Sequence, residues 1–295
     1  MNKTAERQVN AVVHNEDVLG ESPFWDWRTG HLYWVDLRKP ALYRLHAATG
    51  AVENWTMPSF IGCVVGNGAG GVLVGLADGV YAFEPENAEL KLLLPLEAEI
   101  AEHRLNDAKC DAQGALWIGT MWDFGRHPAG SLYRINADLN VTVVRRDISV
   151  PNAVSFSPDG GVIYFTDSRI GTLEKGTLDA ARAQVTRWDT ILAANQLPGS
   201  PDGATVDAEG FVWHARFQGS AIVRVAPDGR IDREIPLPVS RPTSCAFGGP
   251  DLKTLYITTG RQGMTPEELA SEPLAGALLA VDVDVQGRRE GLFGR

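Results

Sequence analysis

The sequence predicts an all-β fold, a six-bladed β-propeller whose four-stranded antiparallel blades surround a central channel. Six strand-like segments rich in β-branched and aromatic residues each follow a polar turn and begin at residues 30, 71, 114, 161, 210 and 253. They are 41 to 49 residues apart, the length of a four-stranded blade. A sandwich would show short strands without this longer period.

Each repeat contains further elements in the same order. A second strand-like segment follows the first at residues 42–45, 80–83, 132–135, 173–175, 222–225 and 278–281. One more short strand precedes each polar turn and is expected to be the innermost of its blade. Turns such as Asp111–Gly114 supply the side-chain acceptor and the positive φ that tight turns need. A capping box at Thr265 and Glu268, with Pro266 between them, predicts one short helix.

Length and composition agree with this repeat. The chain has 295 residues, which alone allows one or two domains, and six blades of about 49 residues would use all of it. We therefore expect a single domain, residues 1–295, with residues about 1–8 disordered. The chain has 31 glycines and 17 prolines, more than average usage, and this excess is assigned to the turns.

Charge and cysteine content exclude several classes of protein. The 37 acidic and 27 basic side chains give a net charge of −10, which argues against a nucleic-acid partner. There is no apolar stretch of about 20 residues and no signal-peptide core, so no membrane partner is expected. Three separated cysteines, Cys63, Cys110 and Cys245, suit a reducing compartment and predict a cytoplasmic protein with buried thiols.

The informative pattern is the residue five positions before each turn between the first and second strands. The six blades place there Glu21, Gly62, Asn106, Asn152, Asp202 and Ser244. Four of these carry a carboxylate or a carboxamide. Because the innermost strands line the channel, the four side chains should form a ring around one mouth.

Such a ring calls for a cation. Converging carboxylates repel and cost several kcal/mol to desolvate unless a positive charge lies between them. Oxygen donors without Cys or His predict one hard divalent ion, Ca²⁺ first, with Mg²⁺, Mn²⁺, Zn²⁺ or Fe²⁺ also compatible. The alternative is that each residue caps its own turn, which explains any one of them more simply than it explains four in one register.

The loops after the second strands should overhang the ring. They comprise residues 121–128, 216–219 and 259–275, and their aromatic, Arg and Asp side chains, Asp123 included, are expected to line a polar pocket for a small molecule. The histidines His103 and His214 fall near the same mouth and are interpreted as packing or surface residues. The G-x-G-x-x-G spacing at residues 66–71 leads into a strand, so it predicts a hairpin turn and not a dinucleotide site.

The chain resembles the SMP-30/gluconolactonase/regucalcin family of sugar lactonases along nearly its whole length. The motifs that carry the resemblance lie at residues 19–25, 104–107, 119–121, 151–160, 201–210 and 242–250. The resemblance implies a six-bladed propeller with one divalent ion held by Glu21, Asn152 and Asp202. It also implies that Arg104 and Asn106 contact the substrate.

The function expected from these residues is metal-dependent hydrolysis of an aldonolactone, such as a glucono-, xylono-, arabino- or galactonolactone, to the aldonic acid. Asp202 would ligate the ion and accept the proton of water, and Asp123 is a further candidate substrate contact. An aryl-ester or phosphotriester hydrolase and a non-catalytic calcium-binding regulatory propeller stay open. We expect a monomer or a weak homo-oligomer.

Two departures from the family pattern bear on the substrate. The segment 213–219, with His214 and Arg216, lacks the usual small residues, and Cys110 stands where a small aliphatic residue is common.

Overall fold

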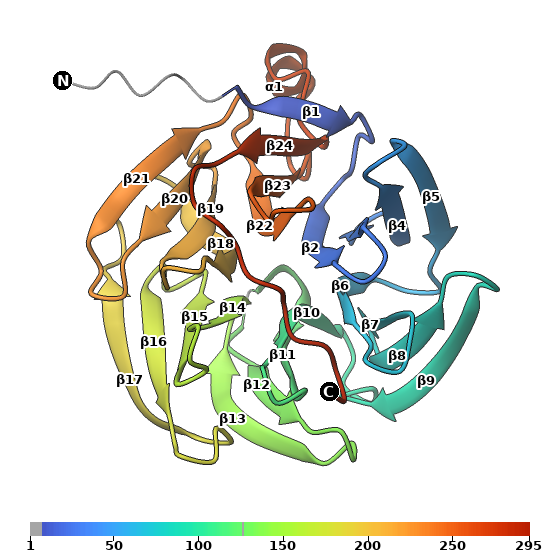
Figure 1. Cartoon of the computed structure of the whole chain (residues 1–295), viewed down its shortest axis with the longest axis vertical. Helices are drawn as coiled ribbons and strands as arrows, with labels where there is room; N and C mark the ends of the chain where they lie inside the picture. Colours follow the sequence, from blue (N-terminus) through green and yellow to red (C-terminus); the bar gives the residue numbers. More distant parts are fainter. Residues whose placement is uncertain (1–7, 126) are drawn as a thin grey trace.

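Six four-stranded antiparallel sheets surround a central channel, which confirms the predicted six-bladed propeller (Figure 1). The computed structural model describes residues 8–125 and 127–295. The disorder expected for residues about 1–8 therefore concerns residues that lie, except for Gln8, outside the described part.

The strands follow the repeat from the channel outward. Blade 1 contains β2 (Gly20–Asp26), β3 (His31–Asp36), β4 (Ala41–His46) and β5 (Ala51–Thr56). Blade 2 contains β6 (Ile61–Gly66), β7 (Val72–Leu76), β8 (Gly79–Glu84) and β9 (Glu89–Pro95). Blade 3 contains β10 (His103–Cys110), β11 (Leu116–Trp122), β12 (Gly130–Ile135) and β13 (Val141–Ile148).

The second half of the ring repeats this order. Blade 4 contains β14 (Pro151–Phe156), β15 (Val162–Asp167), β16 (Leu173–Leu178) and β17 (Val185–Leu192). Blade 5 contains β18 (Ser200–Val206), β19 (Val212–Phe217), β20 (Ala221–Val225) and β21 (Ile231–Pro236). Blade 6 contains β22 (Pro242–Gly248), β23 (Thr254–Thr259), β24 (Leu278–Asp282) and, as its outer strand, β1 (Asn10–Val13).

The ring is closed by the two ends of the chain. Strand β1 pairs antiparallel with β24, with Asn10 opposite Ala280, so the N-terminal strand completes the last blade. The repeat does not reveal this pairing, because it joins segments almost the whole sequence apart. A closed ring leaves the inner sheet edges covered.

The polar turns are built as their sequence suggests. The Oδ1 atom of Asp111 accepts from the amides of Gln113 and Ala115, and its Oδ2 accepts from Trp117 Nε1 at 2.8 Å. Asp207 makes the same three contacts in blade 5, ending at Trp213 Nε1. Both tryptophans are fully buried. One carboxylate therefore fixes the turn and anchors the large core side chain six residues later.

The core lies between the blades. A cluster containing Trp213 and Ile222 of blade 5 with Leu255 and Ile257 of blade 6 joins those two sheets, and equivalent clusters join other neighbouring blades. Full burial of one such side chain contributes about 1.5–3 kcal/mol. The contacts hold adjacent inner strands in a fixed register around the channel.

Every inner strand contains a bulge near its beginning. The register shifts occur between Glu21 and Phe24, Ile61 and Cys63, Leu105 and Ala108, Asn152 and Ser155, Pro201 and Ala204, and Pro242 and Ser244. Ser22 and Ala153, directly after two ring positions, have φ of 51° and 57°. Because a bulge redirects side chains, all six strands change direction at the predicted ring.

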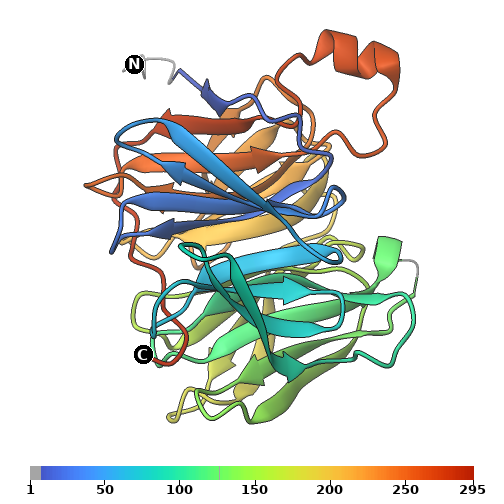
Figure 2. The same ribbon diagram turned by 90° about the vertical axis from the view of Figure 1, so that its right-hand side faces the viewer.

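The two ends of the channel differ. Residues 285–295, which we call the C-terminal strap, cross the end opposite the ring (Figures 1 and 2). The strap carbonyls of Gln286 and Phe293 accept from the amides of Ala208 and Gly68. Helix α1 (Pro266–Ser271), with the predicted capping box, projects from the other face (Figure 2).

No helix within residues 8–125 and 127–295 has the length and apolar character needed to cross a membrane.

Candidate functional site

The structure brings the predicted ring residues into one cavity. Glu21 of β2, Asn106 of β10, Asn152 of β14 and Asp202 of β18 line a cavity of about 280 Å³, together with Arg104. Half of the other lining residues are also polar, among them Arg38, Arg169 and Gln262. The size is close to the lower end of the range typical of small-molecule sites. Their convergence is the geometry that the register predicted, whereas their roles stay a proposal.

The ring position of blade 2 is occupied by glycine for a steric reason. A Cβ added at Gly62 would lie 2.2 Å from the carbonyl oxygen of Leu105 in the next inner strand. No larger residue fits without moving that backbone. Ser244, the ring residue of blade 6, is buried and closely approaches Gly203. The oxygen donors at the mouth therefore come from the other four blades.

A chain of hydrogen bonds orients the two carboxamides. Arg104 donates to Oδ1 of Asn106 at 2.7 Å, and Asn106 Nδ2 donates to Oδ1 of Asn152 at 2.9 Å. Asn152 Nδ2 donates to Ser168 Oγ, which donates to the carbonyl of Pro201. Each side-chain oxygen retains a second lone pair. The amides are thus held with their oxygens in fixed places.

The two carboxylates of the ring are placed unfavourably for a site without a cation. Asp202 is only 8% exposed, and among the described residues its buried Oδ1 atom has no hydrogen-bond partner. Burial, and then the charge of Asp107, raise the pKa of Asp202 well above its ordinary value. Burial, Asp202 and Asp107 do the same for Glu21.

This donor set fits a hard divalent ion. Within residues 8–125 and 127–295, no three His, Cys, Asp or Glu side chains cluster as metal ligands. The ring supplies two carboxylates, and its remaining oxygens are the carboxamide of Asn152 and that of Asn106. All are ligand types that Ca²⁺, Mg²⁺ and Mn²⁺ accept.

Asp107 is a residue that the sequence reasoning missed. Its Oδ2 accepts from the amide of Val154 at 2.9 Å, which links blades 3 and 4 below the ring. Burial raises the pKa of Asp107 to about 6, although Lys109 and backbone amides oppose the shift. Its position directly after the ring residue Asn106 was the available signal, because a bulge there turns consecutive side chains toward the channel.

Asp123 holds two arginines instead of facing the ring. Its Oδ1 accepts from Arg104 Nε at 2.6 Å, and both of its oxygens accept from Arg38 at 2.7 and 2.8 Å. Burial opposes ionisation, but the hydrogen bonds from Arg38 and Arg104 lower the pKa of Asp123. It lines an adjoining cavity with Phe60, Glu102 and His103. Its expected contact with substrate stays a prediction.

The overhanging loops contribute as their topology predicted. Phe124, Phe217, Gln218 and Gln262 line the ring cavity. Arg126, in the first of these loops, lies outside the described residues. Arg216, also in the second loop, is not among the residues that line the cavity.

His214 and Arg216 do not line the cavity. His214 is fully buried, and burial lowers its pKa to about 3. Arg216 donates to the carbonyls of Leu197, Pro198 and Gly199, so it holds a loop in place.

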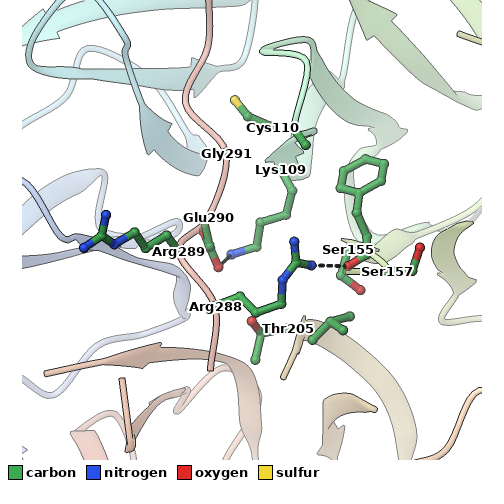
Figure 3. A pocket seen from close by; sticks show the side chains of 12 residues that line it. Lys109, Cys110, Ser155, Ser157, Thr205, Arg288, Arg289, Glu290 and Gly291 are labelled. Carbon is green, nitrogen blue, oxygen red and sulfur yellow. Dashed lines mark hydrogen bonds and ion pairs between the residues drawn. The ribbon is translucent and has the colours of Figure 1, made fainter. Parts of the chain in front are cut away.

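A second, smaller cavity lies at the opposite end of the channel. It measures about 110 Å³ and is lined by the strap residues Arg288 and Glu290, with Lys109 and Cys110 (Figure 3). Lys109 Nζ lies 2.5 Å from Glu290 Oε1.

The free thiols Cys63 and Cys245 are buried in inner strands as expected, and burial raises their pKa to about 12. They are therefore packing residues and not nucleophiles.

Comparison with known proteins places these motifs in a family. The family model described as SMP-30/Gluconolactonase/LRE-like region matches residues 19–261. The chain is 38% identical to 6-deoxy-6-sulfogluconolactonase of Pseudomonas putida over 294 residues, 99% of each chain. It is 31% identical to L-arabinolactonase of Azospirillum brasilense, covering 97% of this chain and 95% of the relative.

A solved structure is also similar to the chain along nearly its whole length. Regucalcin of Agrobacterium tumefaciens, described as a calcium-binding protein, superposes with a TM-score of 0.94 at 30% identity and covers 98% of each chain.

Proposed function

The chain belongs to the SMP-30/gluconolactonase/LRE-like family, and we propose that it hydrolyses an aldonolactone to the aldonic acid with the help of one divalent ion. Relatives named as lactonases along almost the whole chain support a lactone-hydrolysing enzyme of the carboxylic ester hydrolase class. The bound ion and the identity of the lactone belong to the proposal.

The observation that carries the proposal is the buried Oδ1 atom of Asp202, which lacks a partner among the described residues. A buried acceptor without a partner costs about 1–3 kcal/mol, and more when it is charged. A cation held by Glu21, Asn152 and Asp202 would remove this cost. When bound, such an ion supplies a Lewis acid that polarises the lactone carbonyl and stabilises the developing oxyanion.

The side chains of the cavity account for the remaining steps. Asp202 accepts, at a carboxylate oxygen, the proton of the water that adds to the carbonyl carbon. The ring C–O bond then breaks, and the leaving ring oxygen takes that proton back from Asp202 to become a hydroxyl group. Arg104 and Asn106, held in one hydrogen-bonded chain, orient the sugar hydroxyls. Asp123 keeps the Arg104 guanidinium in place.

The names of the relatives do not identify which lactone this chain hydrolyses. Their names include a sulfonated hexonolactone and a pentonolactone. A glucono-, xylono-, arabino- or galactonolactone therefore fits the proposal equally. The charged and carboxamide side chains in the cavity support a sugar over an aryl ester. A cytoplasmic location and a monomeric or weakly oligomeric state stay predictions.

Acid release from hexono- and pentonolactones, followed before and after chelation, tests the function. We expect turnover that is lost in EDTA and restored by at least one of Ca²⁺, Mn²⁺, Mg²⁺ or Zn²⁺. Turnover that EDTA does not affect would refute the metal requirement. Preference for aryl esters, or calcium binding without any turnover, would favour the other two classes.

A further inference from the structure

Three blades repeat one loop after their second strand. An arginine stands two residues beyond the strand end as Arg38 in blade 1, Arg169 in blade 4 and Arg261 in blade 6. The residue before each arginine donates its amide to the segment leading into the inner strand: Leu37 to Leu19, Ser168 to Val150 and Gly260 to Arg241, at 2.9–3.0 Å. These equal contacts show that the three arginines occupy equivalent positions.

The three guanidinium groups differ in their partners. Arg38 pairs with Asp123 at 2.7 Å, and Arg261 pairs with Glu16 at 3.2 Å. Arg169 lines the ring cavity and is exposed, and its guanidinium makes no hydrogen bond or ion pair with any part of the chain that the structure describes. Of the three, it is the one with its charge open to a ligand.

The backbone that carries Arg169 is fixed. The carboxylate of Asp167 accepts from the amides of Ser149, Val150 and Arg169 at 2.8–3.1 Å. Ser168 is bonded to Asn152 and Pro201. The base of the side chain is thus tied to the ring, and only the guanidinium end is free to adapt.

The charges of the cavity wall leave a positive excess. Arg38 and Arg104 share a single carboxylate, that of Asp123. The proposed divalent ion would balance Glu21 and Asp202. The buried Asp107, whose charge acts on both of these carboxylates, offsets the remaining charge of the Arg38–Asp123–Arg104 group, so the charge of Arg169 stays unbalanced. A neutral polyol requires hydrogen-bond donors but no net positive charge, whereas an anionic ligand is stabilised by both.

We propose that Arg169 is a specificity-determining residue that binds an anionic group on the sugar lactone, namely a sulfonate, carboxylate or phosphate. The inference rests on the proposed function and narrows its substrate class. A planar guanidinium forms two parallel hydrogen bonds with such groups. One charged hydrogen-bonded contact of this kind corresponds to about 10- to 100-fold in kcat/KM.

Steady-state kinetics on matched substrates test the proposal. Glucono-δ-lactone is compared with derivatives that carry a sulfonate, a carboxylate or a phosphate at the terminal carbon. The wild-type enzyme should prefer at least one anionic lactone by about 10-fold or more. Arg169→Gln should lose about 10- to 100-fold in kcat/KM for that substrate, mainly through KM, and far less for the neutral lactone. Arg169→Lys should restore part of the loss.

A control separates the local contact from net charge. Arg182 lies in the same blade beside Gly161, in the connection between the outer strands β16 and β17. Arg182→Gln removes the same charge and should leave the preference unchanged. Calorimetric titration with glucarate and gluconate supplies a readout without turnover, in which Arg169→Gln should weaken glucarate binding more.

The results distinguish failure of the role proposed for Arg169 from failure of the proposed lactonase function. Equal losses on neutral and anionic lactones in Arg169→Gln, or a wild-type enzyme without anionic preference, overturn the role of Arg169 and leave the lactonase intact. A wild-type protein that hydrolyses none of these lactones refutes the proposed function itself.

Discussion

Asn106 donates from Nδ2 to Oδ1 of Asn152 at 2.9 Å and thereby joins blade 3 to blade 4 at the mouth of the channel. The acceptor is the atom with which Asn152 would ligate a cation, and Nδ2 of Asn152 is in turn bonded to Ser168. The orientation of this proposed ligand is thus decided by residues on two neighbouring elements.

Ser168→Ala should weaken metal binding because it frees Nδ2 of Asn152 and lets the amide rotate. Loss of such a supporting hydrogen bond typically costs about 10- to 100-fold in metal affinity or activity. Calorimetric titration with Ca²⁺ measures the change directly. Ser271→Ala, on the exposed face of α1, is the matched control. Unchanged Ca²⁺ affinity in Ser168→Ala would show that the amide is held by Asn106 alone.

Asp202→Asn should abolish turnover and stabilise the metal-free protein. The substitution removes the buried carboxylate charge of Asp202. Burial and the neighbouring charge of Asp107 make this charge costly. We expect the Tm in EDTA to rise by roughly 2–5 °C, and the Tm increase caused by Ca²⁺ to disappear. Glu89→Gln, an exposed site on β9, controls for net charge. Near wild-type hydrolysis by Asp202→Asn contradicts its catalytic role.

Asp123→Ala should lower kcat/KM by about 10- to 100-fold, because Arg38 and Arg104 lose their shared carboxylate and repel each other. Asp123→Glu keeps the charge and should retain most of the activity. Separate measurement of kcat and KM distinguishes orientation of bound substrate from affinity. Full activity of Asp123→Ala would mean that Asn106 suffices to hold Arg104.

Asp17 should make stability depend on pH. Burial and then the charge of Asp36 raise the pKa of Asp17 from 3.8 to about 7 in the folded protein. The folded state therefore binds this proton more tightly than the unfolded state. Its stabilising effect is fully present below pH 3.8 and is lost as the pH rises through about 7.

Urea unfolding at pH 5 and pH 8 of the wild type and of Asp17→Asn isolates this effect. Asn cannot ionise, so the stability advantage of the variant over the wild type should be larger at pH 8 than at pH 5, by roughly 2–3 kcal/mol. The difference between the two proteins cancels the contributions of other acids. A difference that does not vary with pH would exclude titration of Asp17 in this range.

Glu290→Ala should destabilise the protein, because it leaves the buried ammonium of Lys109 without its partner in the strap. Breaking a buried ion pair costs roughly 3–5 kcal/mol. Asp189→Ala breaks the exposed pair with Arg187 and should cost less than about 1 kcal/mol. Urea unfolding of both variants provides the comparison. Equal, small losses would show that the strap contributes little to stability.

The sequence by itself determined the blades and the ring positions. Turn chemistry at Asp111 and Asp207 is local, and the shared length of the inner strands fixes which residue lies five positions before each turn. Counting back from the turns therefore reached Glu21, Asn106, Asn152 and Asp202. The register was informative because all blades share one geometry.

Only the tertiary structure decided which groups meet across blades. Asp123 pairs with Arg38 of blade 1 and Arg104 of blade 3, whereas the guanidinium of the equivalent Arg169 has no ion pair within the described part of the chain. Closure by β1 and the strap over the channel are likewise contacts between distant segments. Periodicity cannot predict them, because side-chain partners across a closed ring depend on the packing of all six sheets and not on any local pattern.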